Sequence, residues 1–463
     1  MSGFWKILIK GGTVVLGPAV SQQDILIEGE RIAAIGKFAV QADEYVDATD
    51  LLVLPGAIDS HVHFDDEFMG TMSVHDYYTG TRAAAFGGVT SVIDFSNQIP
   101  NESLMQTIEV KKEAARDKAL VDWGVHPVIT NTGEKYLAEI PHLIQEGAPT
   151  IKCYMTYRQE GLMMTVDDLR RVSQRLRDAG GMLMVHAEDN AILESSIEEM
   201  IKSGRTAPVY HARSRPAEAE NQAIRQCIRV TEQTDGRIFV VHLASATGMD
   251  LITKARARGV DILAETCTHY LVFTEDMLER DDGMKWICSP PLRDKANQDR
   301  LWEGLQFGAI SLVSSDDAAY SWSAKQMGKD RFDKCPNGIA GIEVRLPLLY
   351  SEGVAQGRLT LPRLVEIVST KPANLFGLAP RKGSLAPGSD ADIVLFDPEA
   401  KWTMGQGTLH MATDYSSYED IEITGKVIKV FSRGELIIDG DECLAEKGRG
   451  RYLHRKLDMS FGP

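Results

Sequence analysis

The sequence is short of basic residues and has no long apolar run. Its 50 lysines and arginines are outnumbered by 66 aspartates and glutamates, which gives a formal net charge of −16. Nucleic-acid binding needs a basic surplus that neutralises phosphates, so we expect no nucleic-acid partner. No stretch approaches the roughly 20 apolar residues that a membrane helix needs, so we expect no membrane partner either.

The sequence also lacks the CxxC spacing that is typical of metal-binding and redox cysteines. Its six cysteines are scattered, at Cys153, Cys227, Cys267, Cys288, Cys335 and Cys443. The first residues open into a strand pattern rather than an apolar signal region. We therefore expect reduced thiols and a cytoplasmic protein.

What the chain does contain is an alternation of short apolar runs with longer amphipathic stretches, the signature of a parallel βαβ sheet. The apolar runs lie at residues 51–58, 89–95, 121–129, 150–155, 181–186, 237–243, 261–267 and 310–315. Eight such runs with helical patterns between them, as at 166–172 and 249–255, predict an α/β fold built on a (β/α)8 TIM-like barrel.

Both ends of the chain have β patterns instead. Alternating residues surround a tight glycine turn at 24–32, and similar alternation returns at 426–438. We expect the two ends to form one small β-sandwich domain. The expected segments are 1–54 and 381–440 for the sandwich, 55–380 for the barrel, and 441–463 for a charged, turn-rich tail with the pattern of a solvated terminus.

Candidate metal ligands follow the apolar runs, at the strand ends where barrel chemistry collects. His61 and His63 stand two residues apart, so both imidazoles leave the first strand on the same face. The fourth, fifth, sixth and eighth runs add Lys152, His186, His242 and Asp316. Each residue alone has an ordinary alternative, such as an ion-pair partner, a hydrogen-bonded strand end or a helix cap. Their recurrence at the same end of different strands predicts a metal site.

Several motifs together resemble the cyclic amidohydrolases, above all their dihydropyrimidinase and hydantoinase branch. They follow the order and spacing of that family over nearly the whole chain. The motifs are Asp59-Ser60-His61-Val62-His63, Gly87-Gly88-Val89-Thr90, Ile151-Lys152-Cys153-Tyr154, His186-Ala187-Glu188, Val241-His242-Leu243, Glu265-Thr266-Cys267-Thr268-His269-Tyr270-Leu271, Ser289-Pro290-Pro291-Leu292-Arg293 and the segment 382–392.

The resemblance implies two divalent metal ions, by default Zn²⁺, with Mn²⁺ or Co²⁺ also suited to imidazole and carboxylate ligands. Lys152 would be carboxylated by CO₂ to a carbamate that bridges both ions, since an ammonium cannot ligate a metal. The implied ligands are His61, His63, the carbamate and Asp316 for the more buried ion, and His186, His242 and the same carbamate for the other.

The resemblance also implies the reaction: hydrolytic opening of a small cyclic amide or ureide to an N-carbamoyl amino acid. Asp316 would move the proton to the leaving nitrogen, and Tyr157 would donate a hydrogen bond to the oxyanion. Backbone groups of Ser289 and Asn337 would hold the ring. From the residues alone, a packed loop aromatic is the preferred interpretation of Tyr157, and Ser289 and Asn337 are loop residues beside proline or glycine.

Two features depart from this branch. Asp317 follows Asp316 where the branch usually has His-Cys-Pro, and a second acid there could raise the pKa of Asp316. The loop after the paired histidines carries Asp65, Asp66 and Glu67 where the branch tends to be apolar. These three acids either favour a polar or cationic substituent on the substrate or are simply solvated.

Other functions remain open. Allantoinase, or another cyclic ureide or imide hydrolase, shares nearly the whole framework. Dihydroorotase is disfavoured, because that group has an arginine where this chain has Asp65. A non-catalytic dihydropyrimidinase-like assembly protein would lack the metal ligands, and all six are present. The resemblance further implies a homotetramer or homodimer, in which the tail would pack on a neighbouring subunit.

Overall fold

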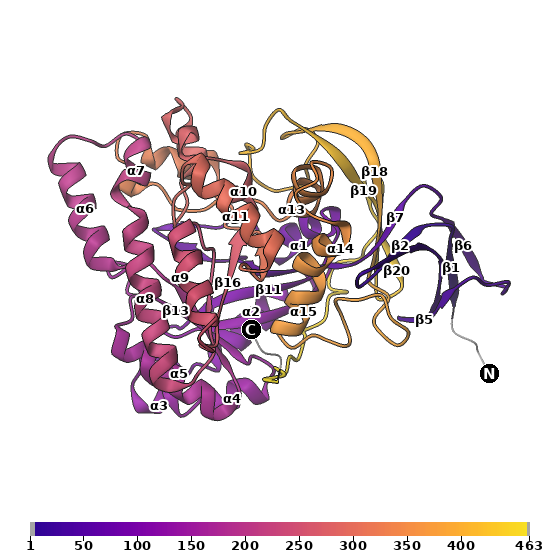
Figure 1. Cartoon of the computed structure of the whole chain (residues 1–463), viewed down its shortest axis with the longest axis horizontal. Coiled ribbons are helices and arrows are strands. Elements are labelled where there is room, and N and C mark those ends of the chain that lie inside the picture. Colours follow the sequence, from indigo (N-terminus) through magenta and orange to yellow (C-terminus); the bar gives the residue numbers. More distant parts are fainter. Residues whose placement is uncertain (1–4, 461–463) are drawn as a thin grey trace.

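A computed structural model of the chain describes residues 5–460. Its centre is a sheet of eight parallel strands in the order β17-β16-β15-β14-β13-β12-β11-β8, surrounded by helices (Figure 1). Each strand lies within or overlaps one predicted run, which confirms the barrel. The strands are β8 (Ala57–Val62), β11 (Val89–Asn97), β12 (Asp122–Val128), β13 (Thr150–Tyr154), β14 (Met182–His186), β15 (Ile238–Val240), β16 (Ile262–Cys267) and β17 (Leu312–Ser314).

Two of the helices confirm helical patterns that were predicted from the sequence. The stretches expected at 166–172 and 249–255 lie in α5 and α9, and α5 begins with a capping box at Thr165 and ends at Gly180 with φ +78°. The helices are α1 (Tyr77–Phe86), α2 (Gln106–Ala115), α3 (Glu134–Leu137), α4 (Ile140–Gln145), α5 (Val166–Ala179), α6 (Asn190–Lys202), α7 (Val209–Ser214), α8 (Ala217–Thr234), α9 (Ala246–Arg256), α10 (Thr268–Val272), α11 (Lys295–Phe307), α12 (Trp322–Lys325), α13 (Arg345–Leu348), α14 (Leu361–Val365) and α15 (Lys371–Leu375).

Shorter elements complete the barrel loops. They are the hairpin β9 (Glu67–Phe68) and β10 (Thr71–Met72), and the 3-10 or π segments η1 (Glu275–Glu279), η2 (Gly283–Trp286), η3 (Gln326–Gly328), η4 (Phe332–Lys334), η5 (Leu349–Val354) and η6 (Glu366–Thr370). None of the helices within residues 5–460 is long and apolar enough to cross a membrane.

The barrel closes between its first and last strands through a buried arginine. The guanidinium of Arg345 donates to the carbonyl of Val313 at 2.8 Å and to that of Ile58 at 3.0 Å. It also pairs with Asp59 at 3.3 Å. Just beyond, the backbone N–H of His63 donates to the carbonyl of Asp317 at 2.9 Å. This seam therefore brings the residues after β8 and those after β17 together.

The apolar run at 51–58 was expected to be one strand, and this expectation is wrong. Its first half is β7 (Leu52–Pro55), which pairs with β18, whereas its second half starts the barrel strand β8. Gly56 lies between them, and a Cβ atom at this position would be 2.2 Å from Oγ1 of Thr90. Because only glycine fits there, the chain can pass directly from one sheet into the other.

The two chain ends form the expected sandwich, at one side of the barrel (Figure 1). A seven-stranded sheet β21-β20-β19-β18-β7-β2-β3 combines strands from both ends, and a four-stranded sheet β5-β4-β1-β6 comes from the first end. The strands not yet bounded are β1 (Lys6–Lys10), β2 (Thr13–Leu16), β3 (Ala19–Gln22), β4 (Asp24–Glu28), β5 (Arg31–Gly36), β6 (Glu44–Asp47), β18 (Ile393–Met404), β19 (Ile421–Ser432), β20 (Glu435–Asp439) and β21 (Glu442–Cys443). The domain limits at 54, 380 and 440 stay a prediction.

The tail, expected to be solvated, packs instead on the barrel of its own chain. Arg455 is fully buried and donates to Oγ1 of Thr150, while the N–H of Leu453 donates to the carbonyl of Trp123 at 2.6 Å. Both contacts lie at the amino ends of barrel strands, on the side opposite the predicted site. A contact between the tail and a neighbouring subunit stays a prediction.

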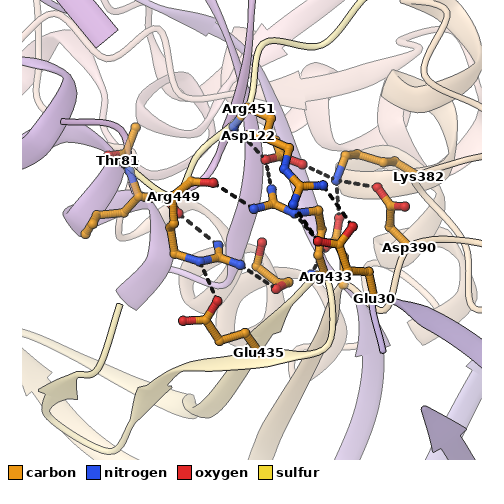
Figure 2. Close-up of polar contacts among 12 residues, drawn as sticks. Glu30, Thr81, Asp122, Lys382, Asp390, Arg433, Glu435, Arg449 and Arg451 are labelled. Carbon is orange, nitrogen blue, oxygen red and sulfur yellow. Dashed lines mark hydrogen bonds and ion pairs between the residues drawn. The ribbon is translucent and has the colours of Figure 1, made fainter. Parts of the chain in front are cut away.

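A buried charge network joins barrel, sandwich and tail at this end (Figure 2). Asp122, at the start of β12, pairs with Lys382 at 2.8 Å and with Arg433, and it accepts the backbone N–H of Arg451 at 2.9 Å. Lys382 also contacts Asp390 at 3.0 Å. Burial favours the neutral acid, but the two cations prevail and lower the pKa of Asp122 to about 2.

We predict that Asp122→Ala lowers the free energy of unfolding by about 3–5 kcal/mol, because Lys382 and Arg433 lose a buried partner. The stabilisation by Asp122 is complete above the unfolded pKa of about 4 and is lost as the pH falls toward 2. Urea unfolding followed by tryptophan fluorescence, repeated along a pH series, measures both effects. Glu113→Ala is the control, since it breaks only an exposed pair with Arg116; an equal loss in both variants would contradict the prediction.

Candidate active site

All nine residues predicted from the sequence border one pocket at the carboxyl end of the barrel strands. They are His61, His63, Lys152, Tyr157, His186, His242, Ser289, Asp316 and Asn337. They come from the ends of five barrel strands and from three loops that are far apart in the sequence. The fold therefore assembles the predicted set in one place.

His61 and His63 face Asp316 and are each held from behind by a carboxylate. Nε2 of His61 is 2.9 Å from Oδ1 of Asp316, and its Nδ1 is 2.6 Å from Oε1 of Glu265. Nε2 of His63 is 3.5 Å from the same Oδ1, and its Nδ1 is 3.3 Å from Oδ2 of Asp66. A carboxylate on one ring nitrogen fixes the tautomer and presents the other nitrogen as a ligand.

The second histidine pair lies close by, with the rings of His186 and His242 4.4 Å apart. Nε2 of His186 is 2.8 Å from Glu188, which also pairs with Arg215 at 2.8 Å. Nδ1 of His242 is buried and has no hydrogen-bond partner among residues 5–460. Burial lowers the pKa of both histidines, so the neutral imidazole, the metal-binding form, prevails.

Lys152 is buried and borders the same pocket as the two histidine pairs. Its Nζ lies 4.4 Å from the ring centroid of Phe95 and 4.8 Å from that of Tyr154, and within the described chain it forms no ion pair. Burial, against the opposing charge of Asp316, lowers the pKa of Lys152 to about 8. A larger share of the amine is therefore neutral near physiological pH, and the neutral amine is the form that can react with CO₂.

Three of the site residues hold left-handed backbone conformations. Tyr157 has φ +65°, His242 has φ +40° and Asp316 has φ +49°. Such conformations cost about 1–3 kcal/mol each in a residue other than glycine, and they persist where the surroundings over-determine them. Their grouping around one pocket marks it as a functional site.

Asp317 does not act on Asp316 as expected. Its carboxylate turns away from the pocket and accepts the N–H groups of Gly341 at 2.7 Å and Ile342 at 3.1 Å. It also lies 2.6 Å from Nδ1 of His75. The expected rise in the pKa of Asp316 is wrong: despite burial, His61 and the other imidazoles lower that pKa well below its usual range.

Tyr157 borders the pocket from the loop after β13. Nδ2 of Asn337 donates to its Oη at 3.3 Å. Burial, opposed by the nearby Arg215, raises the pKa of Tyr157 to about 12. The hydroxyl therefore keeps its proton at any working pH. Ser289 lies beside it, and its buried Oγ finds no partner in the part of the chain described.

The acidic loop contributes one residue to the pocket rather than three. Asp66 borders it and accepts from Nδ2 of Asn97 at 3.2 Å. Asp65 instead accepts the N–H of Tyr77 at 3.2 Å, at the start of α1, and Glu67 is exposed. An influence of the loop on the substrate substituent stays a prediction, and it now rests on Asp66 alone.

Sequence reasoning missed the carboxylates that hold the histidines. Glu188 and Glu265 lay inside the quoted motifs, and Asp66 was read only as a substrate contact. Arg215, which pairs with Glu188, carried no motif at all. A search for an acid near each candidate histidine could have found Glu188, whereas the contact of Glu265 with His61 spans 204 residues.

The chain matches a known protein family. Residues 52–437 match the model of the Amidohydrolase family. The chain belongs to this family, which implies a binuclear metal centre. The residues fit such a centre, because Nδ1 of His242 is buried without a partner among the described residues, and His61, His242 and Asp316 offer ligand atoms within 4.8 Å of one another.

Within the family, the chain falls in the dihydropyrimidinase and hydantoinase branch. It is 40% identical over 456 residues to the D-phenylhydantoinase of Escherichia coli strain K12, covering 97% of this chain and 98% of the relative. The dihydropyrimidinase structure from Brevibacillus agri NCHU1002 is 40% identical, with a TM-score of 0.96 over 97% of this chain and 99% of the other. The L-hydantoinase (dihydropyrimidinase) from Arthrobacter aurescens is 29% identical, with a TM-score of 0.91 over 98% and 100%.

The role of Asp317 yields a stability prediction. Asp317→Ala removes the acceptor of two backbone N–H groups and the partner of Nδ1 of His75, so we expect the free energy of unfolding to fall by about 3 kcal/mol. Asp317→Asn should lose less, because its amide oxygen still accepts from the two N–H groups. Chemical denaturation measures both variants, with the exposed Glu67→Ala as control. Equal losses for the Ala and Asn variants would contradict this account.

Proposed function

We propose that the protein is a binuclear-metal hydrolase that opens the cyclic amide bond of dihydropyrimidines or 5-substituted hydantoins and releases N-carbamoyl amino acids. The observation that carries the proposal is the convergence of all nine predicted residues on one pocket. The full-length similarity to a D-phenylhydantoinase and a dihydropyrimidinase supports the same substrate group.

We infer that His61, His63 and Asp316 hold one ion, that His186 and His242 hold the other, and that carboxylated Lys152 joins both. The ligand atoms of His61 and Asp316, proposed for the first ion, and of His242, proposed for the second, lie within 4.8 Å of one another. This closeness supports two neighbouring ions. The lowered pKa of Lys152 supports carboxylation. Zn²⁺ is the default ion, and Mn²⁺ or Co²⁺ suit the same ligands.

When bound, the two ions would make a water molecule nucleophilic at neutral pH and polarise the amide carbonyl. Asp316, which stays ionised, accepts the proton of the attacking water and passes it to the leaving ring nitrogen. Tyr157 keeps its proton and donates a hydrogen bond to the oxyanion. Backbone groups of Ser289 and Asn337 hold the planar ring.

The proposal also covers the cellular compartment and the oligomeric state of the enzyme. We infer a cytoplasmic homotetramer or homodimer, in keeping with the resemblance. The six cysteines are all free and five of them are buried, which suits a reducing compartment. Allantoinase remains the alternative enzyme, and a non-catalytic assembly protein remains the alternative of a different class.

The decisive experiment is ring opening by the metal-loaded protein, followed as loss of amide absorbance. The panel comprises dihydrouracil, hydantoin, 5-substituted hydantoins of both hands, allantoin, dihydroorotate and simple cyclic imides. We expect turnover of dihydrouracil or a hydantoin. Turnover of allantoin alone would favour the alternative enzyme, and metal binding without any turnover would overturn the proposal.

Lys152 provides a sharper variant test. Lys152→Ala and Lys152→Arg should each lower kcat by more than ~100-fold, because neither side chain can form the bridging carbamate. Loss of a residue that only hydrogen-bonds to a metal ligand already lowers activity about 10–100-fold, and loss of a ligand should lower it further. Metal content should fall in parallel, and a carbamate signal from ¹³CO₂ in the NMR spectrum should vanish. Full metal content and activity in Lys152→Arg would contradict the role of the lysine.

Removing the hydroxyl of Tyr157 should change the catalytic rate rather than the binding of the substrate. Tyr157→Phe should lower kcat by about 10²–10³-fold with little change in KM, since the hydrogen bond forms mainly in the transition state. Because the pKa of Tyr157 is about 12, the wild-type rate should show no loss from tyrosine ionisation up to about pH 10. A change confined to KM would identify Tyr157 as a ring-packing residue instead.

A further inference from the structure

Two buried ion pairs lie near the carboxyl ends of β14 and β15. Glu188, which contacts His186, pairs with Arg215 at 2.8 Å. Glu220, in the first turn of α8, lies 3.5 Å from Arg293. All four charged residues are buried. A buried charge is costly unless it is paired, so these four side chains have little freedom to move apart.

Arg293 joins the two pairs into one double ion pair. Its Nη1 donates to the backbone carbonyl of Arg215 at 2.5 Å, while its Nη2 faces Glu220. That carbonyl belongs to the same residue whose guanidinium holds Glu188. Arg293 also ends the segment that starts at Ser289 and that we propose holds the ring. The double ion pair therefore connects the partner of a histidine ligand with the ring-binding loop.

Glu220 also fixes the backbone that follows His242. Its Oε1 accepts the N–H of Ala244 at 2.8 Å, and the N–H of Leu243 donates to the carbonyl of Glu265 at 2.8 Å. His242 itself holds φ +40°. A residue other than glycine keeps such a conformation only where its surroundings over-determine it. The two hydrogen bonds supply that constraint and so set the direction of the imidazole.

The ligands proposed for the first ion are held by other contacts. Nδ1 of His61 faces Glu265, and the backbone N–H of His63 donates to the carbonyl of Asp317. Within residues 5–460, no member of the double ion pair forms a hydrogen bond or ion pair with His61, His63 or Asp316. The double ion pair therefore supports the second group of ligands selectively.

We propose that Glu220 and Arg293 are positioning residues for the second ion, which hold its ligands His186 and His242 in place and tie them to the ring-binding loop. This inference rests on the proposed function, because it assumes a centre of two ions. Each of the two residues acts through a backbone group rather than as a ligand itself. Without them, the two imidazoles lose the orientation that metal binding needs.

The test is a zinc titration of Glu220→Ala against a competing chelator, which gives a separate affinity for each of the two ions. Loss of the carboxylate releases the N–H of Ala244 and leaves Arg293 without its acid. We expect the affinity for one ion to fall at least ~10-fold, as for other partners of metal ligands, and the affinity for the other ion to stay unchanged. Ring opening should return at saturating zinc.

Two further variants serve as controls. Asp122→Ala also removes a buried acid that pairs with two cations, but at the amino ends of the strands, so it should bind both ions as wild type does. Glu220→Gln keeps an oxygen that accepts the N–H of Ala244 and loses the charge that faces Arg293. It should retain more zinc affinity than Glu220→Ala, and its KM should rise because the loop of Ser289 is less constrained.

Other outcomes refute the positioning role. Equal weakening of both ions in Glu220→Ala, unchanged binding of both, or the same selective loss in Asp122→Ala would each do so. If Glu220→Ala does not fold, Arg293→Lys replaces it, because one ammonium does not span both partners of the guanidinium. Unchanged binding of both ions in that variant would refute the role. A wild-type protein that binds two ions but opens no ring would refute the proposed function alone, and one that binds a single ion would refute both.

Discussion

The position of the Asp316 carboxylate is the constraint on which the site depends. Asp316 follows the last barrel strand at the seam that Arg345 closes by bonding both β8 and β17. The same seam holds the backbone of His63 against Asp317. The contacts that close the barrel therefore also bring the first histidine pair to Asp316. The packing and hydrogen bonds of the same seam offset the free-energy cost of the left-handed backbone at Asp316.

The barrel separates the site from the interactions that secure its other end. At the carboxyl ends of the strands, carboxylates face imidazoles, and burial lowers the pKa of His186 and His242, so their neutral form leaves nitrogens available. At the amino ends, Asp122 is enclosed by Lys382 and Arg433 in a network that reaches the tail. The two arrangements differ because a metal site must leave ligand valences open, whereas a structural network must satisfy every charge.

The barrel and the six candidate metal ligands could be predicted from the sequence, because strand ends in a barrel converge by geometry and both patterns are local. Tyr157, Ser289 and Asn337 were implied only by the family resemblance. The directions in which individual side chains point could not be predicted in this way. Asp317 is adjacent to Asp316 in sequence, yet it serves His75 and the backbone at 341–342. Glu265 reaches His61 across the barrel. The division of the run 51–58 at Gly56 depends on the contact with Thr90, and the docking of the tail depends on burying Arg455. Such contacts exist only once the chain has folded.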